Sequence, residues 1–254
     1  MSSQEVKVKN DSARDAQFWA QPMTTLHVTD VPQGAKNLNM EGRQVLGPLQ
    51  GFGRMWQRTY RVRLDGLDIT PQQIVADWKK NFAVFQPANN HFYPSMAGIK
   101  PGEMVFIDTT LPVIPGRPGI LPIAVGVMVL YADDTTFTVM TPEGHPFAGW
   151  NTFSAYEEDG VTYAQVQALC RPSDPIYEFG YRFMGGEPEE DKVWYHVLRS
   201  VAGHWGLHDA AIEFNKNLVD DKVQWSQWKN IWKNAAVRTT IYLLASPIRW
   251  ARGK

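Results

Sequence analysis

The sequence predicts an α+β fold in which a curved antiparallel sheet is wrapped around one long helix in the C-terminal half of the chain. Two observations carry this prediction. Residues 118–171 contain four consecutive segments with apolar side chains at every second position, separated by short turns, which is the pattern of antiparallel strands with one buried face. Residues 188–205 repeat apolar side chains with the period of an amphipathic helix. A sheet of that size needs such a helix to cover its apolar face.

The N-terminal part of the chain predicts an arm, a strand and a helix. Residues 1–50 are polar, carry no sustained period and contain several prolines, so we expect an irregular arm there. The alternation over residues 55–64 predicts the first strand. Thr70 and Pro71 supply a helix cap and a first-turn proline ahead of apolar residues at helical spacing, which reach as far as Phe85.

The middle of the chain is expected to be mostly strand. Residues 91–94 are expected in a loop, and residues 104–111 in a second strand. The four alternating segments follow, with a loop at residues 141–146 between their two halves. After them a proline-rich break leads into an aromatic segment, residues 177–183, which is expected to connect the sheet to the long helix at residues 188–205.

The last part of the chain, residues 209–254, begins loosely and then places tryptophans at helical spacing beside lysines. Three interpretations stay open: packing on the domain, a homodimer, or peripheral membrane contact through residues 225–250, with basic side chains toward phosphate headgroups. We therefore expect an N-terminal arm at residues 1–50, a sheet-and-helix domain at residues 51–208 and a helical tryptophan-rich tail at residues 209–254.

Composition excludes several classes of function. With 25 basic and 26 acidic residues in 254, no net field would attract nucleic acid, so no nucleic-acid partner is expected. The single cysteine, Cys170, allows neither an internal disulfide nor a cysteine-based zinc site, and a cytoplasmic location is the expectation. The sequence has no glycine-rich phosphate loop, nucleophile elbow or zinc-protease helix, and we expect no cofactor.

One short motif carries a resemblance. Gly144-His145-Pro146 is followed by Gly149 and Phe153, and then by the strand at residues 166–172. Together with the order of elements over residues 53–206, this resembles the helix-grip fold of the START-like (SRPBCC) superfamily, and more narrowly a family of uncharacterised bacterial and plant proteins. The superfamily includes lipid-transfer domains, the birch-pollen-allergen family, and polyketide cyclases and aromatases. The resemblance implies a cavity for a hydrophobic molecule between sheet and helix, with catalysis in only some members.

Three side chains could move protons if the protein is an enzyme. His145 lies in a loop between strands, where an imidazole titrates near neutral pH, but it could equally hold the turn by bonding to backbone. Asp108 would have a raised pKa if it faced the interior of its strand, and would be an ordinary wet carboxylate if it faced outward. Tyr177 beside Arg171 could hold an oxyanion or a carboxylate ligand, unless Arg171 is used in an ion pair of the connector.

The predicted cavity has a set of expected wall residues, mostly aromatic, which would otherwise be ordinary core. They are Trp150, Phe153, Tyr163, Arg171, Phe179 and Val197. His196 and His204 lie near one helical face, but further ligands at suitable spacing are missing, so no metal is expected.

The leading hypothesis is that the cavity binds a hydrophobic small molecule, such as a lipid, a polyketide or an isoprenoid-like compound. A second hypothesis is a cyclase, dehydratase or isomerase that acts on such a molecule by general acid–base chemistry. A third is a membrane- or protein-interaction module that works through the tryptophan-rich tail. Whether the protein is an enzyme stays open at this point.

Overall fold

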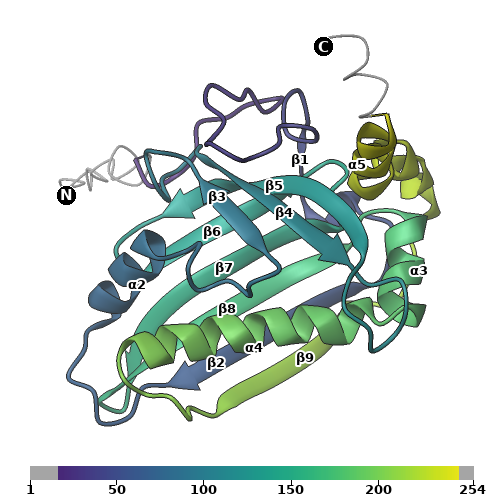
Figure 1. Ribbon diagram of the computed structural model, residues 1–254. Coiled ribbons are helices and arrows are strands. Elements are labelled where there is room, and N and C mark those ends of the chain that lie inside the picture. Colours follow the sequence, from purple (N-terminus) through teal and green to yellow (C-terminus); the bar gives the residue numbers. More distant parts are fainter. Residues whose placement is uncertain (1–16, 246–254) are drawn as a thin grey trace, which may run out of the picture.

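The computed structural model describes residues 17–245, and its centre is a large antiparallel sheet. Along the sheet the strand order is β3-β4-β5-β6-β7-β8-β2-β9, and β1 pairs with β6. The strands are β1 (Val45–Leu46), β2 (Met55–Arg63), β3 (His91–Pro94), β4 (Met104–Leu111), β5 (Leu121–Ala132), β6 (Thr136–Pro142), β7 (Phe147–Glu158), β8 (Val161–Pro172) and β9 (Ile212–Asp220). The sheet curves around the long helix α4, which lies across its concave face (Figure 1). This confirms the predicted α+β helix-grip architecture.

Five helical elements besides α4 lie around the sheet. The helical elements are η1 (Pro48–Gln50), α2 (Pro71–Lys80), α3 (Pro175–Phe183), α4 (Gly186–His204), η2 (Trp225–Lys233) and α5 (Ala235–Leu244), where η denotes a 3₁₀-helix. Helix α2 covers the concave face at one end, whereas α3 and α5 lie together at the other end (Figure 1). Between residues 17 and 245, no helix combines the length and the apolar character that a membrane crossing requires.

Helix α2 begins where the sequence predicts. The Thr70 hydroxyl accepts a hydrogen bond from the backbone N–H of Gln73 at 3.3 Å, and the Gln73 side chain accepts one from the N–H of Thr70 at 2.9 Å. This reciprocal capping satisfies two of the amide groups that a helix start leaves without partners. Ile74, Val75 and Trp78 on its inner side are buried against the sheet.

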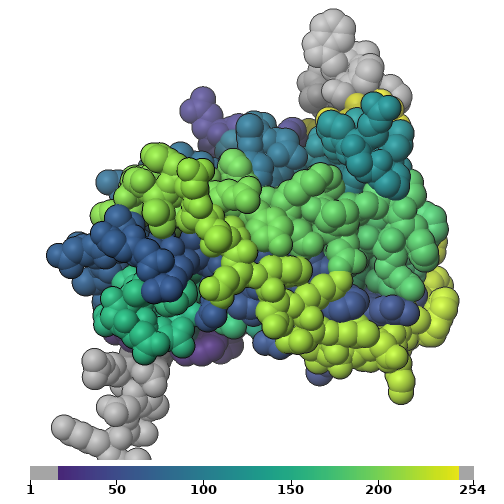
Figure 2. All heavy atoms as spheres, turned by 90° about the horizontal axis from the view of Figure 1, so that it is seen from below, coloured from purple at the N-terminus to yellow at the C-terminus, as the bar shows by residue number. Residues whose placement is uncertain are grey.

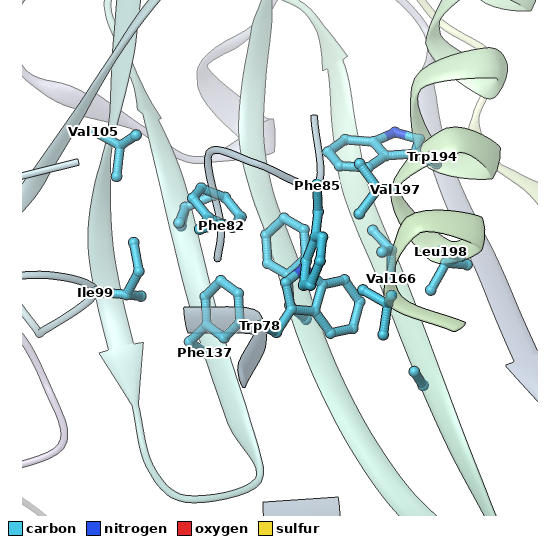
Figure 3. Packing of buried hydrophobic residues seen from close by; sticks show 14 of the residues in the cluster. Trp78, Phe82, Phe85, Ile99, Val105, Phe137, Val166, Trp194, Val197 and Leu198 are labelled. Carbon is cyan, nitrogen blue, oxygen red and sulfur yellow. The ribbon is translucent and has the colours of Figure 1, made fainter. Parts of the chain in front are cut away.

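The aromatic core fills the gap between the sheet and the helices at the α2 end. Phe137 and Phe153 stack at 4.6 Å, and the rings of Trp78 and Phe82 meet Phe153 edge-on at 5.5 and 5.4 Å. Figure 3 shows Trp78 of α2, Phe82 in the turn after α2 and Phe137 of the sheet on one side, and Trp194 and Val197 of α4 on the other. Aromatic pairs in this geometry pack densely, so this end of the domain is closed.

The arm covers the convex face of the sheet. Leu26 and Met40 are fully buried there against Phe106 of β4 and Met128 of β5. Alternate residues of β4 therefore face the arm, whereas Val105 belongs to the concave core. Residues 1–16 of the predicted arm lie outside the described residues.

Strand β9 is the main departure from the sequence prediction, which placed these residues in a loose beginning of the tail. It pairs along its length with β2, and Phe214 stacks on Tyr60 at 4.8 Å. Its side chains alternate poorly because β9 is an edge strand with mostly exposed side chains, so burial does not impose a pattern on it. Figure 2 shows its yellow-green residues along the surface beside α4. Part of the predicted tail therefore belongs to the sheet.

Two shorter segments also differ from expectation. Residues 91–94 form strand β3 on β4 rather than a loop. The aromatic segment after Arg171 is helix α3, and Asp174 caps it by accepting hydrogen bonds from the amides of Ile176 and Tyr177 at 2.8 and 3.0 Å. Asp174 followed by Pro175 is the same start signal as Thr70 followed by Pro71, so the signal was present in the sequence.

The tryptophan-rich tail is two helical pieces rather than one. Asn234 separates them: its side-chain oxygen caps α5 by accepting from the amide of Val237 at 3.0 Å, and its amide donates to Asp174 at 2.8 Å. The α5 part packs on the domain, with Ala236 and Thr239 buried beside β5. The tryptophans of η2 do not share this burial, and residues 246–254 of the tail lie outside the described residues.

Candidate functional site

A cavity of about 700 Å³ lies on the concave side of the sheet, at the end away from the packed aromatic core. Phe82, Phe153 and Trp194 stand at the boundary, because each belongs both to the core and to the cavity wall. Strands β4 to β8 form one side of the cavity, and α3, α4 and α5 form the other. The apolar side chains that the strands contribute include Ile107, Leu121, Ile123, Val125, Val127 and Val139.

The mouth of the cavity is apolar. Phe179 on α3 and Ile241 on α5 both line the cavity and are 57% and 61% exposed. Ile176 and Val237 beside them are also exposed wall residues. Apolar side chains gathered at the entrance of an apolar cavity favour the passage of a hydrophobic guest.

Tyr177 holds this end of the domain together. Its hydroxyl donates a hydrogen bond to the carbonyl oxygen of Gly144 at 3.2 Å and accepts one from the amide of Ala236 at 3.1 Å. The same Gly144 oxygen accepts from the amide of Ala235 at 3.0 Å. Burial raises the pKa of the Tyr177 hydroxyl far above its usual value, so it stays protonated at neutral pH. Tyr177 therefore joins α3, the β6–β7 turn and the start of α5, and neither role is catalytic.

The backbone conformation and the close surroundings of position 144 require glycine there. Its φ is +88°, a conformation that side chains rarely adopt, and a Cβ at this position would overlap the carbonyl oxygen of Lys233. The Gly144-His145-Pro146 turn thus packs directly against the backbone that connects η2 to α5. The sequence does not predict this contact, because it depends on where the tail packs in the fold.

His145 follows it at the cavity wall. Its Nδ1 contacts the backbone of Phe147, at 3.1 Å from the amide nitrogen and 3.2 Å from the carbonyl oxygen. This fixes the ring and leaves Nε2 as the ring nitrogen without a hydrogen-bond partner among residues 17–245. Burial lowers the pKa of His145 to about 4, although the Phe147 contact opposes this shift. At neutral pH the wall therefore presents an uncharged imidazole.

Glu190 on α4 is a wall residue that the sequence analysis missed. Its carboxylate accepts hydrogen bonds from Arg58 at 3.2 Å and from the Tyr181 hydroxyl at 2.9 Å. Burial raises the pKa of Glu190, and the Arg58 guanidinium opposes that shift. The signal was its position: Glu190 lies three and seven residues before Val193 and Val197, which places it on the inner face of the helix.

Arg58 itself stands behind the wall rather than in it. Its side chain is 1% exposed and also binds Asp191 at 2.7 Å and Glu187 at 2.9 Å. The guanidinium thus joins β2 to the first turns of α4, and its charge is used there. No lysine or arginine is among the wall residues that the described chain provides.

Five of the predicted site residues border the cavity, and one of them also borders a hollow on the convex side. His145, Tyr177, Phe153 and Phe179 line the cavity. Trp150 borders it as well, but it also borders a second hollow on the convex side with Trp19 and Tyr131. Because Trp150 is three residues from Phe153 on the same strand, its side chain faces the convex side, opposite to Phe153.

The other predicted residues do not reach the cavity. Asp108 forms an ion pair with Lys36 of the arm on the convex side, so the interior carboxylate that the acid hypothesis required is absent at this position. Tyr163 stacks on Tyr156 at 5.5 Å, outside the concave core. Val197 is on the concave side but fully buried in the packed core.

Arg171 is also used elsewhere. It is fully buried and donates to Asp220 at the end of β9 at 2.8 Å. The sequence analysis considered ion pairs with neighbours in the connector, but the partner comes from a strand that it did not predict. A ligand carboxylate therefore finds no arginine at this position, and that reading of Arg171 is wrong.

Metal ligation has no support in the described part of the chain, since residues 17–245 contain no group of three or more histidine, cysteine or acidic side chains placed to share an ion.

No protein-family model and no curated protein matches the chain. Solved structures that it resembles include the di-domain ARO/CYC StfQ from the steffimycin biosynthetic pathway, at 9% identity and a TM-score of 0.43, over 59% of this chain and 50% of that one. Ara h 8.0201 matches at 10% identity and a TM-score of 0.40, over 59% and 97% of the two chains. Major latex-like protein 151 from Panax ginseng matches at 10% identity and a TM-score of 0.38, over 61% and 99%.

At these identities and TM-scores the matches carry no conclusion about function. The helix-grip resemblance expected from the sequence is confirmed by the fold itself, through the strand order and the helix α4 on the concave face. The narrower resemblance of Gly144-His145-Pro146 to one uncharacterised family stays a prediction.

Proposed function

We propose that the protein binds a hydrophobic small molecule, such as a lipid, a polyketide or an isoprenoid-like compound, in the cavity between the sheet and α4. The observation that carries this proposal is the volume of about 700 Å³ behind apolar walls. Ligand pockets commonly have volumes of about 300–1,000 Å³, whereas ordinary interiors contain few voids larger than a water molecule. An empty apolar cavity of this size would lose many packing contacts and destabilise the fold, and a bound guest would restore those contacts.

The polar groups of the wall support the same proposal. Gln86 and Thr240 each carry a buried polar atom that lacks a hydrogen-bond partner within residues 17–245. Such atoms cost free energy unless a water or a ligand satisfies them. The cavity thus suits a mostly apolar molecule with a small number of polar groups.

A blocking variant at the mouth tests this proposal. Val237→Trp places an indole at a wall position that is 43% exposed, where a larger side chain has room to turn toward the cavity. The matched control is Leu244→Trp on the same helix, which is 74% exposed and not a wall residue. Each protein is purified natively, and the small molecules that accompany it are extracted and identified by mass spectrometry.

The proposal expects a hydrophobic compound in near-stoichiometric amount with the natural protein and with Leu244→Trp, and its loss with Val237→Trp. If retinol, used as an added hydrophobic probe, also fails to bind the natural protein, the proposed function is wrong. Equal retention by the two tryptophan variants would place the binding site elsewhere.

An acid–base enzyme of the cyclase, dehydratase or isomerase type has narrower support. Of the three side chains expected to move protons, Asp108 is outside the cavity and the Tyr177 hydroxyl holds two backbone groups. His145 is the one that offers a ring nitrogen at the wall, with the Glu190 carboxylate as a further wall group. Turnover of the copurified compound, abolished by His145→Phe while binding persists, would support the enzyme; unchanged compound after incubation would count against it.

The exposed tryptophans of η2 favour membrane contact as an additional function. Trp225 and Trp232 are 70% and 75% exposed, and Trp228 between them is also exposed, beside Lys229. Indoles beside cations suit the interface of an anionic bilayer. Replacing the three tryptophans by alanine should reduce flotation with vesicles that contain phosphatidylserine. Unchanged flotation, or a dimer by sedimentation that the same replacement dissociates, would contradict membrane contact.

A further inference from the structure

The charged groups at the wall of the cavity are all acidic. Glu189 and Glu190, both on α4, are wall residues, and neither a lysine nor an arginine of the described chain lines the wall with them; the exposed Lys192 pairs with Glu189 at 2.6 Å from outside the wall. The nearest buried cation, Arg58, is already bound by Glu187, Glu190 and Asp191. A guest that brought a carboxylate or a phosphate to this end would therefore bury a negative charge without a counter-ion beside existing carboxylates, which is strongly unfavourable.

His145 is an uncharged polar group at the wall that can bind a guest. His145 is fixed through Nδ1 by the backbone of Phe147, so Nε2 is available. The imidazole is neutral at physiological pH because burial lowers its pKa to about 4. A neutral Nε2 forms a hydrogen bond with a hydroxyl in either tautomer, and with a carbonyl oxygen when Nε2 carries the proton. It offers no charge to a carboxylate.

We infer that the cavity selects uncharged hydrophobic ligands whose hydroxyl or carbonyl group hydrogen-bonds to Nε2 of His145, and that it discriminates against the corresponding acids. This inference rests on the proposed function and specifies its ligand class. It replaces the expectation that Arg171 and Tyr177 hold a carboxylate, since Asp220 occupies the arginine and backbone groups occupy the tyrosine hydroxyl.

Three probes with one carbon skeleton separate charge from shape: retinol, retinoic acid and methyl retinoate. Their dissociation constants are measured by quenching of tryptophan fluorescence at pH 7.5, with the natural protein and with each variant. The inference predicts that retinol and methyl retinoate bind at least about tenfold more tightly than retinoic acid, because an unpaired buried charge costs more than a neutral hydrogen bond returns.

Three variants at the wall test the cause of this discrimination. His145→Phe keeps a ring but removes the polar nitrogen, so the affinity for retinol should fall about threefold to tenfold, which is the usual worth of one neutral hydrogen bond. The affinity for retinoic acid should not change. His145→Gln retains an uncharged hydrogen-bonding group and should restore most of the retinol affinity, which a purely structural role of His145 would not explain. Val237→Lys adds a cation at the exposed edge of the wall and should tighten binding of retinoic acid selectively.

The outcomes are distinguishable. Retinoic acid bound as tightly as methyl retinoate, or more tightly, would overturn the inference while leaving the proposed function in place. An equal loss of affinity for all three probes in His145→Phe would also overturn it, since the effect would then be one of shape. If none of the probes binds the natural protein, the proposed function fails and the inference fails with it.

Discussion

Replacing Tyr177 by phenylalanine tests whether this residue is a structural link rather than a catalytic group. The change removes one oxygen atom that holds two buried backbone groups. The amide of Ala236 lies in the first turn of α5 and would lose its acceptor, which costs about 1–3 kcal/mol for a buried group. Gly144 keeps its bond from Ala235, so the loss there is that of one ordinary hydrogen bond, about 0.5–1.5 kcal/mol. Together we expect a decrease in unfolding free energy of about 1.5–4.5 kcal/mol.

Urea unfolding followed by tryptophan fluorescence measures this decrease, and hydrogen exchange at residues 235–244 shows whether α5 opens first. The matched control is Tyr163→Phe, whose ring stacks on Tyr156 and whose hydroxyl makes no hydrogen bond within the described residues. This control should change the unfolding free energy by less than about 0.5 kcal/mol. If the two variants lose the same stability, or if α5 exchanges no faster in Tyr177→Phe, the structural role of Tyr177 is refuted.

Three further predictions follow from the same structure. Folding lowers the pKa of His145 from 6.5 to about 4, so the contribution of the neutral imidazole to the unfolding free energy is complete above pH 6.5 and is lost, by up to about 3 kcal/mol, as the pH falls to 4. Urea unfolding between pH 6.5 and pH 4 should therefore show a weaker pH dependence of stability in His145→Phe than in the natural protein. Equal pH dependences would contradict this prediction. Gly144→Ala should cost at least about 1–3 kcal/mol for its positive φ and speed hydrogen exchange of α5, because the added Cβ overlaps Lys233; natural exchange rates would argue against that contact. Arg58→Met should lower the unfolding free energy by about 3–5 kcal/mol at neutral pH, because it leaves the buried carboxylate of Glu190 without a cation. The loss should shrink as the pH falls and Glu190, whose pKa burial raises, takes up its proton; a pH-independent loss would indicate packing instead.

The concave sheet and its long helix could be predicted because burial imposes a strict pattern on them. Val125, Val127 and Val139 face one core, and Val197 and Val201 repeat at helical spacing toward the same core. Strand β9 escaped prediction for the opposite reason: as an edge strand it buries little, so no alternation is required. The sequence thus predicted the strands of the concave sheet and the long helix, which have a buried face, and missed β9, which buries almost nothing.

The site was predicted less well because its residues depend on face and on distant partners. Asp108 shares its parity with Phe106, and the sequence does not reveal that this face meets the arm instead of the cavity. Arg171 has its partner in the strand that was missed. His145 was correctly placed in a turn bonded to backbone, and the same turn lies at the cavity wall, so the two interpretations offered for it are compatible.

The helices α3 and α5 form the wall around the mouth of the cavity, and the sequence did not predict this position for either helix. Both begin with a capping residue, Asp174 and Asn234, and these two side chains also bind each other at 2.8 Å. A cap can be recognised locally, but a hydrogen bond between two caps sixty residues apart follows only from the fold. The cavity therefore owes its shape to contacts that no periodic pattern encodes.

The central claim is that the space between the sheet and α4 is open to a guest at the end where α3 and α5 lie. A crystal structure of the protein with methyl retinoate tests it most directly. The account predicts electron density for the probe between Val125 and Val193, with its carbonyl oxygen within hydrogen-bonding distance of Nε2 of His145. A structure in which wall side chains fill this space, with the probe absent or bound on another face, would contradict the account.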